Sequence, residues 1–142
     1  MNIKTLYQSA IATTLGCTLA FSSLAEVVLV VHPNNDSSLD TKMVKRIFLG
    51  KASKFSNGNE ATPVNQLPSS ASRVSFDSDT LGRSSSQVSA YWSKLVFTGK
   101  GIPPEELEND AAVIAFVASN ENAVGYVNSS AVTSSVKAIP LN

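Results

Sequence analysis

The sequence predicts one α/β domain in which helices flank a mixed, mostly parallel sheet. A continuous run of aliphatic and β-branched residues, Val27 to Val31, is typical of a strand that is buried on both faces. Segments with helical periodicity and capping residues follow this run, and two more strand-like runs stand near the end of the chain. This alternation of strands and helices is the pattern of an α/β fold.

The beginning of the chain has the layout of a secretory signal peptide. It lacks Asp and Glu, and its apolar residues concentrate between positions 10 and 21. The small residues Ser23 and Ala25 predict cleavage after Ala25. A membrane anchor is the alternative, but the apolar stretch is short and interrupted, whereas a span needs about 20 predominantly apolar residues. We expect residues 1–25 to be removed and residues 26–142 to form a periplasmic domain.

Charge and cysteine content exclude several classes of protein. The formal net charge is zero, and no Lys/Arg cluster indicates nucleic acid or an anionic membrane surface as a partner. The single cysteine, Cys17, lies in the predicted signal peptide, so the exported chain is expected to have neither disulfides nor thiolate metal sites. A lipid anchor on Cys17 is a weaker alternative, because Thr14 stands where a lipobox usually has an aliphatic residue.

Capping residues predict where the first helices begin. Asp40 is an N-cap for a helix over residues 41–49 that ends at Gly50. A short strand is predicted over residues 61–66, and a helix with Val74 pointing inward over residues 71–80.

Two further helices and two strands complete the predicted domain. Ser84 and Gln87 have capping-box spacing before a helix whose apolar face includes Trp92. Asp110 is predicted to cap an apolar helix through Ala118 and, with the acidic residues just before it, to favour the helix dipole. Strands are expected over residues 123–127 and 136–141.

No arrangement of residues indicates catalysis or a cofactor. His32 is the only histidine, and no GxSxG setting surrounds any serine, so the sequence offers no nucleophile, base and orienting acid at recognisable spacing. A strand-end histidine with a structural hydrogen bond is the simpler interpretation. Metal-ligand spacing and glycine-rich phosphate loops are also lacking. We therefore expect a protein that binds rather than an enzyme.

The segment from Asn65 to Arg73 is the best candidate for a binding site. A strand leads there into a serine-rich helix start, which offers free backbone N–H groups and hydroxyl donors to a small oxyanion. Ordinary N-capping by serine explains the same residues without any ligand. The candidate ligand-binding residues are Asn65, Gln66, Ser69, Ser70, Ser72 and Arg73.

Several motifs in matching order resemble one known family. They are Val28 to Asn35, Ile47 to Lys51, Pro63 to Asn65, the Tyr91-Trp92 helix with Phe97 to Gly101, and Val124 to Val127. Together they resemble the second lobe of periplasmic phosphate-binding proteins, and most of all the short, single-lobe proteins described as phosphate transporter substrate-binding-like. The resemblance implies a type II periplasmic-binding-protein lobe, phosphate or a similar oxyanion as ligand, a link to ABC-type phosphate uptake, and no enzymatic activity.

Two departures from that family shape the functional hypotheses. The family places an arginine and a glycine-rich helix start at its phosphate site, whereas this chain has Asn65 and Gln66 there and Arg73 about one helical turn later. The family also closes two lobes around its ligand, and this chain is long enough for one. A membrane permease or a second copy of the chain are therefore the expected partners. The alternative hypothesis is an envelope assembly or protein-interaction module that has lost its ligand.

Overall fold

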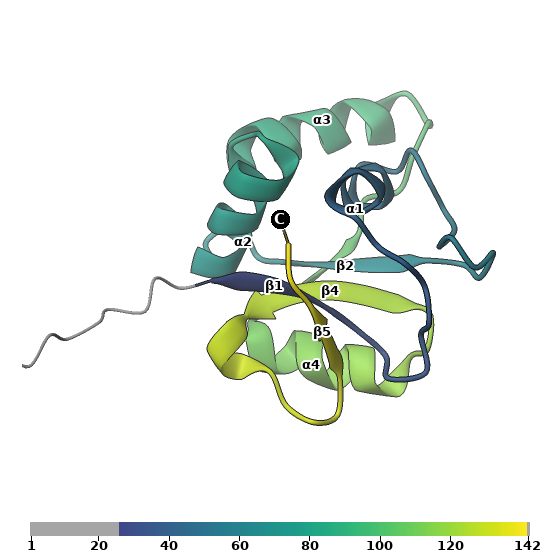
Figure 1. Cartoon of the computed structure of the whole chain (residues 1–142). Helices are drawn as coiled ribbons and strands as arrows, with labels where there is room; N and C mark the ends of the chain where they lie inside the picture. Colours follow the sequence, from purple (N-terminus) through teal and green to yellow (C-terminus); the bar gives the residue numbers. More distant parts are fainter. Residues whose placement is uncertain (1–25, 142) are drawn as a thin grey trace, which may run out of the picture.

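The computed structural model describes residues 26–141, which form a five-stranded sheet with helices on both faces (Figure 1). The strand order is β3-β2-β4-β1-β5. The elements in chain order are β1 (Val27–Val31), α1 (Thr41–Phe48), β2 (Thr62–Gln66), α2 (Ala71–Phe76), a π-helical turn (Asp77–Leu81), α3 (Ser85–Phe97), β3 (Glu105–Leu107), α4 (Asp110–Ser119), β4 (Ala123–Asn128), a 3-10 turn (Ser129–Ala131) and β5 (Lys137–Ile139).

The sheet is mixed, which confirms the predicted α/β class. β2 pairs in parallel with β3 and β4, whereas β1 pairs antiparallel with β4 and β5. Parallel and antiparallel pairings are therefore equal in number, where the sequence had predicted mostly parallel ones. The two antiparallel pairings lie at one side of the sheet, where β1 runs antiparallel to both of its neighbours, β4 and β5.

Two apolar cores lie on the two faces of the sheet. Figure 1 shows α1, α2 and α3 over one face and α4 over the other. We call the core beneath α1, α2 and α3 the upper core, and the core beside α4 the lower core. The upper core contains Leu29, Val31, Phe48, Phe76, Trp92, Val124 and Tyr126 among others. The lower core contains Val28, Val30, Val64, Val113, Val117 and Val127 among others. Adjacent residues of β1 alternate between the cores, which explains its uninterrupted apolar sequence.

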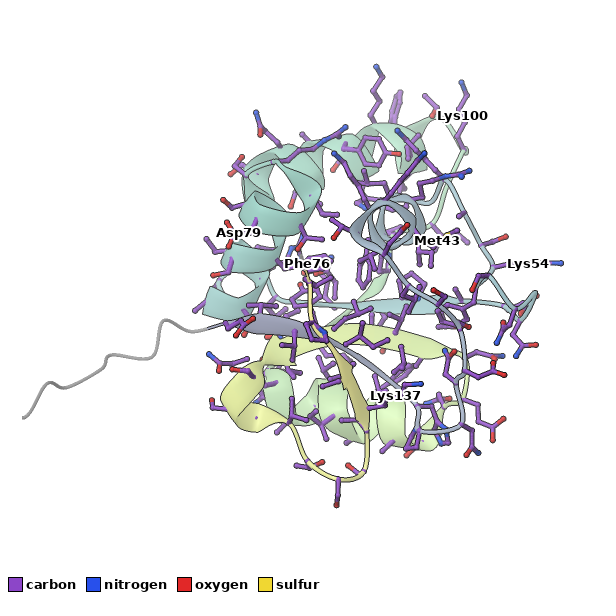
Figure 2. All side chains as sticks on the ribbon, in the orientation of Figure 1. Met43, Lys54, Phe76, Asp79, Lys100 and Lys137 are labelled. Atoms are coloured by element: carbon purple, nitrogen blue, oxygen red, sulfur yellow. The ribbon has the colours of Figure 1, made fainter. Side chains whose placement is uncertain are left out.

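Aromatic rings occupy the centre of the upper core. Phe76 stacks on Tyr126 with ring centroids 3.9 Å apart, and Phe48 meets Phe76 edge-on at 4.8 Å. Figure 2 shows Phe76 between the helices and the sheet, while Lys54 and Lys100 extend outward. Aromatic pairs of this kind add about 0.5–1.5 kcal/mol each beyond their buried area. They fix α1 and α2 against β4.

Most predicted caps are confirmed, and two local predictions are wrong. Asp40 caps α1, and Ser84 and Gln87 form the expected capping box of α3. The cap of α4 is Asn109 rather than Asp110, because the Asn109 side chain accepts the Ala112 N–H at 2.9 Å. Val74 is 51% exposed and not inward.

The acidic segment before α4 is a strand, which the sequence did not predict. Residues 105–107 form β3 at the edge of the sheet, in register with Val64 to Gln66. Two of its three residues are glutamates, so its composition is unlike that of a typical strand. Its position at the edge, where charged side chains remain in water, makes this composition tolerable.

Candidate functional site

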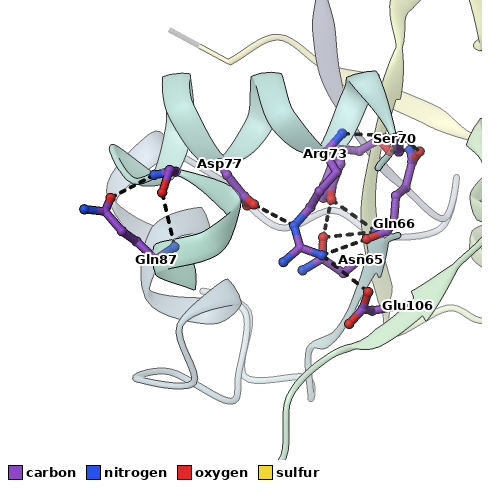
Figure 3. A network of polar contacts seen from close by, with 9 residues as sticks. Asn65, Gln66, Ser70, Arg73, Asp77, Gln87 and Glu106 are labelled. Carbon is purple, nitrogen blue, oxygen red and sulfur yellow. Dashed lines mark hydrogen bonds and ion pairs between the residues drawn. The ribbon is translucent and has the colours of Figure 1, made fainter. Parts of the chain in front are cut away.

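The predicted binding segment divides at the end of β2, because neighbouring strand residues point to opposite faces of a sheet. Val64 packs in the lower core, so Gln66 points toward α4. Asn65 lies between them and points toward α2 and α3. The structure therefore brings Gln66, Ser70 and Ser72 together on one side, through a shared hydrogen bond and a shared contact to Asp110. It places Asn65 and Arg73, which Figure 3 shows close to each other, on the other side.

On the α4 side, the carboxylate of Asp110 accepts hydrogen bonds from the candidate donors Gln66 and Ser72. Asp110 Oδ1 accepts hydrogen bonds from Gln66 Nε2 at 2.7 Å and Ser72 Oγ at 2.9 Å. Asp110 Oδ2 accepts the backbone N–H of Asn128 at 3.3 Å. Hydrogen-bonded in this way, the carboxylate of Asp110 takes the place that the sequence analysis had assigned to an oxyanion.

The remaining serines on this side differ in their environment. Ser70 Oγ donates to Gln66 Oε1 at 2.6 Å and accepts the Arg73 N–H at 3.4 Å, as the N-cap of α2. Ser69 lies exposed in the turn before α2. Of the six candidate residues, Gln66, Ser70 and Ser72 are therefore already engaged by the protein.

On the α3 side, Arg73 is a buried cation with a buried partner. Its side chain is 3% exposed, and Nε donates to Asp77 Oδ2 at 2.6 Å, while the Asp77 side chain is fully buried. Nη1 donates to the backbone carbonyl of Gln66 at 2.7 Å and lies 3.7 Å from Glu106 Oε2. A charged group at this depth is tolerated only when it is paired and hydrogen-bonded.

Two donors on this side have no partner among residues 26–141. Arg73 Nη2 and Asn65 Nδ2 make no hydrogen bond, although Arg73 and Asn65 are only 2% and 3% exposed. Neither atom is completely enclosed by protein, and both residues line the same groove. Because both donors open onto the groove, a ligand there can accept hydrogen bonds from them.

The groove itself lies between α3 and the segment that leads into β3. Its volume is about 420 Å³. Asn65 and Glu106 are register partners on β2 and β3, so they face it from the same side of the sheet. The other lining residues besides Arg73 are Ser89, Trp92, Ser93, Val96, Phe97, Pro103 and Pro104.

Tyr126 connects the two sides through the sheet. Its hydroxyl donates to Asn65 Oδ1 and accepts the N–H of Gln66 at 3.1 Å. Burial of the phenol raises the pKa of Tyr126 well above its ordinary value of about 10. The phenol thus remains neutral and holds the Asn65 amide so that Nδ2 is left for the groove.

Metal-binding clusters do not form within residues 26–141. No group of three His, Cys, Asp or Glu side chains lies close enough there to hold a metal ion. The Nδ1 atom of His32 accepts the Asn34 N–H at 3.1 Å, which confirms a structural hydrogen bond at the end of β1. The predicted signal peptide lies outside the described residues. No helix of the described part is long and apolar enough to cross a membrane.

Comparison with known proteins identifies the fold. No protein-family model and no curated protein matches the chain. A crystal structure of an ABC-type phosphate transport receptor from Vibrio cholerae matches with a TM-score of 0.63 and 22% identity, covering 80% of this chain and 45% of that one. A putative phosphate ABC transporter substrate-binding protein from Clostridium perfringens, with bound phosphate, matches with a TM-score of 0.65 and 22% identity over 82% and 44% of the two chains.

A third structure agrees with the first two. PstS from Borrelia burgdorferi matches with a TM-score of 0.57 and 10% identity, covering 82% of this chain and 47% of that one. The chain therefore has the fold of a periplasmic-binding-protein lobe, as found in substrate-binding proteins of phosphate ABC transporters. It spans less than half the length of these three proteins.

Proposed function

We propose that this protein is a periplasmic binding module that holds phosphate or a similar small oxyanion through Arg73 and Asn65. The observation that carries the proposal is the pair of unpartnered donors, Arg73 Nη2 and Asn65 Nδ2, in one groove. Charge-assisted hydrogen bonds from a guanidinium are among the stronger contacts that a protein makes to an oxyanion.

The α4 side supports the same type of ligand less well. Gln66, Ser70 and Ser72 form a donor cluster, but Asp110 already receives its hydrogen bonds. A second anion there would have to displace that carboxylate. We therefore assign the primary contact to Arg73 and Asn65, and we expect Ser69, which is exposed, to contribute least.

Calorimetric titration with phosphate, sulfate and molybdate tests this function. We expect saturable binding in the millimolar range, because an open groove leaves the anion partly hydrated and its contacts screened. Arg73→Lys keeps a positive charge near Asp77 but loses the planar fork of donors, so affinity should fall about tenfold or more. Arg83→Lys is the matched control, since Arg83 instead lies over the Tyr91 ring. No heat and no thermal shift with any of the three anions would contradict the proposal.

Export and transport are further parts of the proposal. Cleavage after Ala25 predicts a mature protein that begins at Glu26, which mass spectrometry of a periplasmic extract measures directly. Two of the compared proteins are an ABC-type phosphate transport receptor and a putative phosphate ABC transporter substrate-binding protein, so a permease is a candidate partner. A second copy of this chain is the other, because a second lobe would enclose the open groove.

A specific surface feature favours a second candidate function, a protein-interaction module of the envelope. Phe97 is 93% exposed and Ile102 is 91% exposed. These large apolar side chains are close in sequence and flank Lys100, which Figure 2 places at the outer end of α3. Ile102→Ser, at a residue that does not line the groove of Arg73 and Asn65, should weaken capture of a partner from periplasmic extract without changing anion binding. Loss of anion binding with partner capture intact would contradict this assignment.

A further inference from the structure

The groove at Arg73 is large enough to hold a molecule bigger than an inorganic anion. Its volume of about 420 Å³ lies within the range of roughly 300–1,000 Å³ that is typical of sites for small organic molecules. Phosphate has five non-hydrogen atoms and would contact little beyond Arg73 Nη2 and Asn65 Nδ2, the two donors at the floor of the groove. The rest of the groove would then remain filled with water against apolar walls.

Those walls are largely apolar, and Trp92 is the most firmly held of them. Trp92, Val96, Phe97, Pro103 and Pro104 supply most of the lining. The Trp92 ring is confined, since a Cβ atom on Gly50 would approach its Cη2 to 2.7 Å and one on Gly101 would approach its Cζ3 to 3.2 Å. Trp92 is therefore a rigid wall against which an aromatic or branched aliphatic group can pack.

The charges near the floor favour a singly charged head group. Asp77 pairs with Arg73 at 2.6 Å and neutralises its guanidinium, and Glu106 adds a negative charge 3.7 Å from Nη1. A dianion placed on the two free donors would meet more repulsion from these carboxylates than a monoanion would. A carboxylate has two oxygens, one for Arg73 Nη2 and one for Asn65 Nδ2.

We propose that the groove between α3 and β3 binds a small organic monocarboxylate with an aromatic or branched aliphatic body. The carboxylate accepts from Arg73 and Asn65, and the body lies along Trp92 and Phe97. This inference rests on the proposed function, because the anion occupies the same donors, and it specifies the class of ligand.

Fluorescence of Trp92 provides the test, because Trp92 is the only tryptophan in the chain. The purified protein is titrated with phenylacetate, acetate, benzyl alcohol and inorganic phosphate. We expect saturable changes with phenylacetate at a Kd about tenfold or more below those of acetate and phosphate. Benzyl alcohol, which has the ring but no charge, should bind weakly or not at all.

Two serines on α3 give a matched pair of variants. Ser93 lines the groove and Ser86 does not, and both are exposed on the same helix. Ser93→Phe should weaken phenylacetate binding about tenfold by filling the groove, whereas Ser86→Phe should leave it unchanged. Because both positions are exposed, both variants are expected to fold.

The outcomes separate this inference from the proposed function. Binding of inorganic phosphate with no preference for phenylacetate would overturn the inference and leave the oxyanion function standing. Equal affinity for phenylacetate and benzyl alcohol would overturn it as well, because the floor donors would then contribute nothing. Absence of binding by any anion would overturn both proposals. Unchanged phenylacetate affinity in Ser93→Phe would place the ligand elsewhere and also overturn the inference.

Discussion

The two sides of the sheet at the end of β2 differ in whether their hydrogen-bond donors are already occupied by a carboxylate of the protein. On the α4 side, Gln66 and Ser72 hold the carboxylate of Asp110, so the protein supplies its own anion. On the α3 side, Arg73 and Asn65 keep donors without partners in an open groove. A donor cluster in a sequence therefore indicates a ligand site only where the fold leaves its donors free.

The largest expected effect comes from removing the buried cation. Arg73→Ala leaves Asp77 buried without its partner, and breaking such a pair costs about 3–5 kcal/mol. Urea denaturation of the variant and the wild type measures the loss. Arg73→Met combined with Asp77→Leu should recover most of it, because no lone charge then remains buried. A loss below about 1 kcal/mol in Arg73→Ala would show that the pair is not buried as described.

Removing the internal anion should have a smaller effect on the other side. Asp110→Ala removes the acceptor of Ser72 Oγ and one of the two acceptors of Gln66 Nε2, which keeps its hydrogen bond to the Tyr126 carbonyl, at a cost of about 1–3 kcal/mol. Thermal unfolding measures this cost. Glu108→Ala, at an exposed position nearby, is the control and should be close to neutral. Asp110→Ala should leave anion affinity in the α3-side groove unchanged, and a marked loss there would contradict the separation of the two sides.

Tyr126, between the two sides, predicts sensitivity to alkaline pH. Its pKa is raised in the folded protein by burial, so the folded state favours the neutral phenol. Stability from this group is fully present below pH of about 10, the ordinary pKa of tyrosine, and declines above it at up to about 1.4 kcal/mol per pH unit. Urea midpoints measured between about pH 8 and pH 11 show the decline.

Two tyrosine variants isolate that effect. Tyr126→Phe should be less stable at neutral pH, because Gln66 N–H and Asn65 Oδ1 lose a partner, but its decline above about pH 10 should be shallower. Tyr91→Phe removes a hydroxyl that donates to the Leu49 carbonyl and should keep the wild-type decline. Equal declines in all three proteins would argue that Tyr126 ionises freely.

The smallest expected effect is at the rim of the groove. Glu106 is 44% exposed and its oxygen lies 3.7 Å from Arg73, so Glu106→Gln should change stability by less than about 0.5 kcal/mol. The same variant should tighten phenylacetate binding about two- to fivefold by removing a competing carboxylate. Fluorescence titration measures the change, with Glu105→Gln, on the adjacent β3 residue, as the control. Weaker phenylacetate binding in Glu106→Gln would contradict the role of Glu106 as a competing carboxylate.

Sequence patterns predicted the elements with distinct local signals. The run from Val27 to Val31, the Asp40 cap and the Ser84–Gln87 capping box each act over a few residues, and all three are present in the structure. Strand β3 was missed because its identity depends on pairing with β2 rather than on its own composition. The exposure of Val74 likewise depends on how α2 packs on β4, which periodicity over a short helix does not define.

The candidate site was predicted in part. Asn65 and Gln66 are neighbours on a strand, and strand alternation alone could have shown that their side chains face opposite ways. The partners that decide their roles come from distant segments: Asp110 lies 44 residues from Gln66, and Tyr126 lies 61 residues from Asn65. Trp92 and Glu106 acquire a place in the groove only through that tertiary arrangement.

Side-chain NMR during anion titration tests the central contrast most directly. Phosphate or phenylacetate is added to ¹⁵N-labelled protein, and the side-chain amide signals of Asn65 and Gln66 are followed together with the guanidinium signals of Arg73. Our account predicts saturable shifts for Asn65 and Arg73 and almost none for Gln66, whose amide remains bound to Asp110. Shifts confined to Gln66, with Asn65 and Arg73 unchanged, would contradict it.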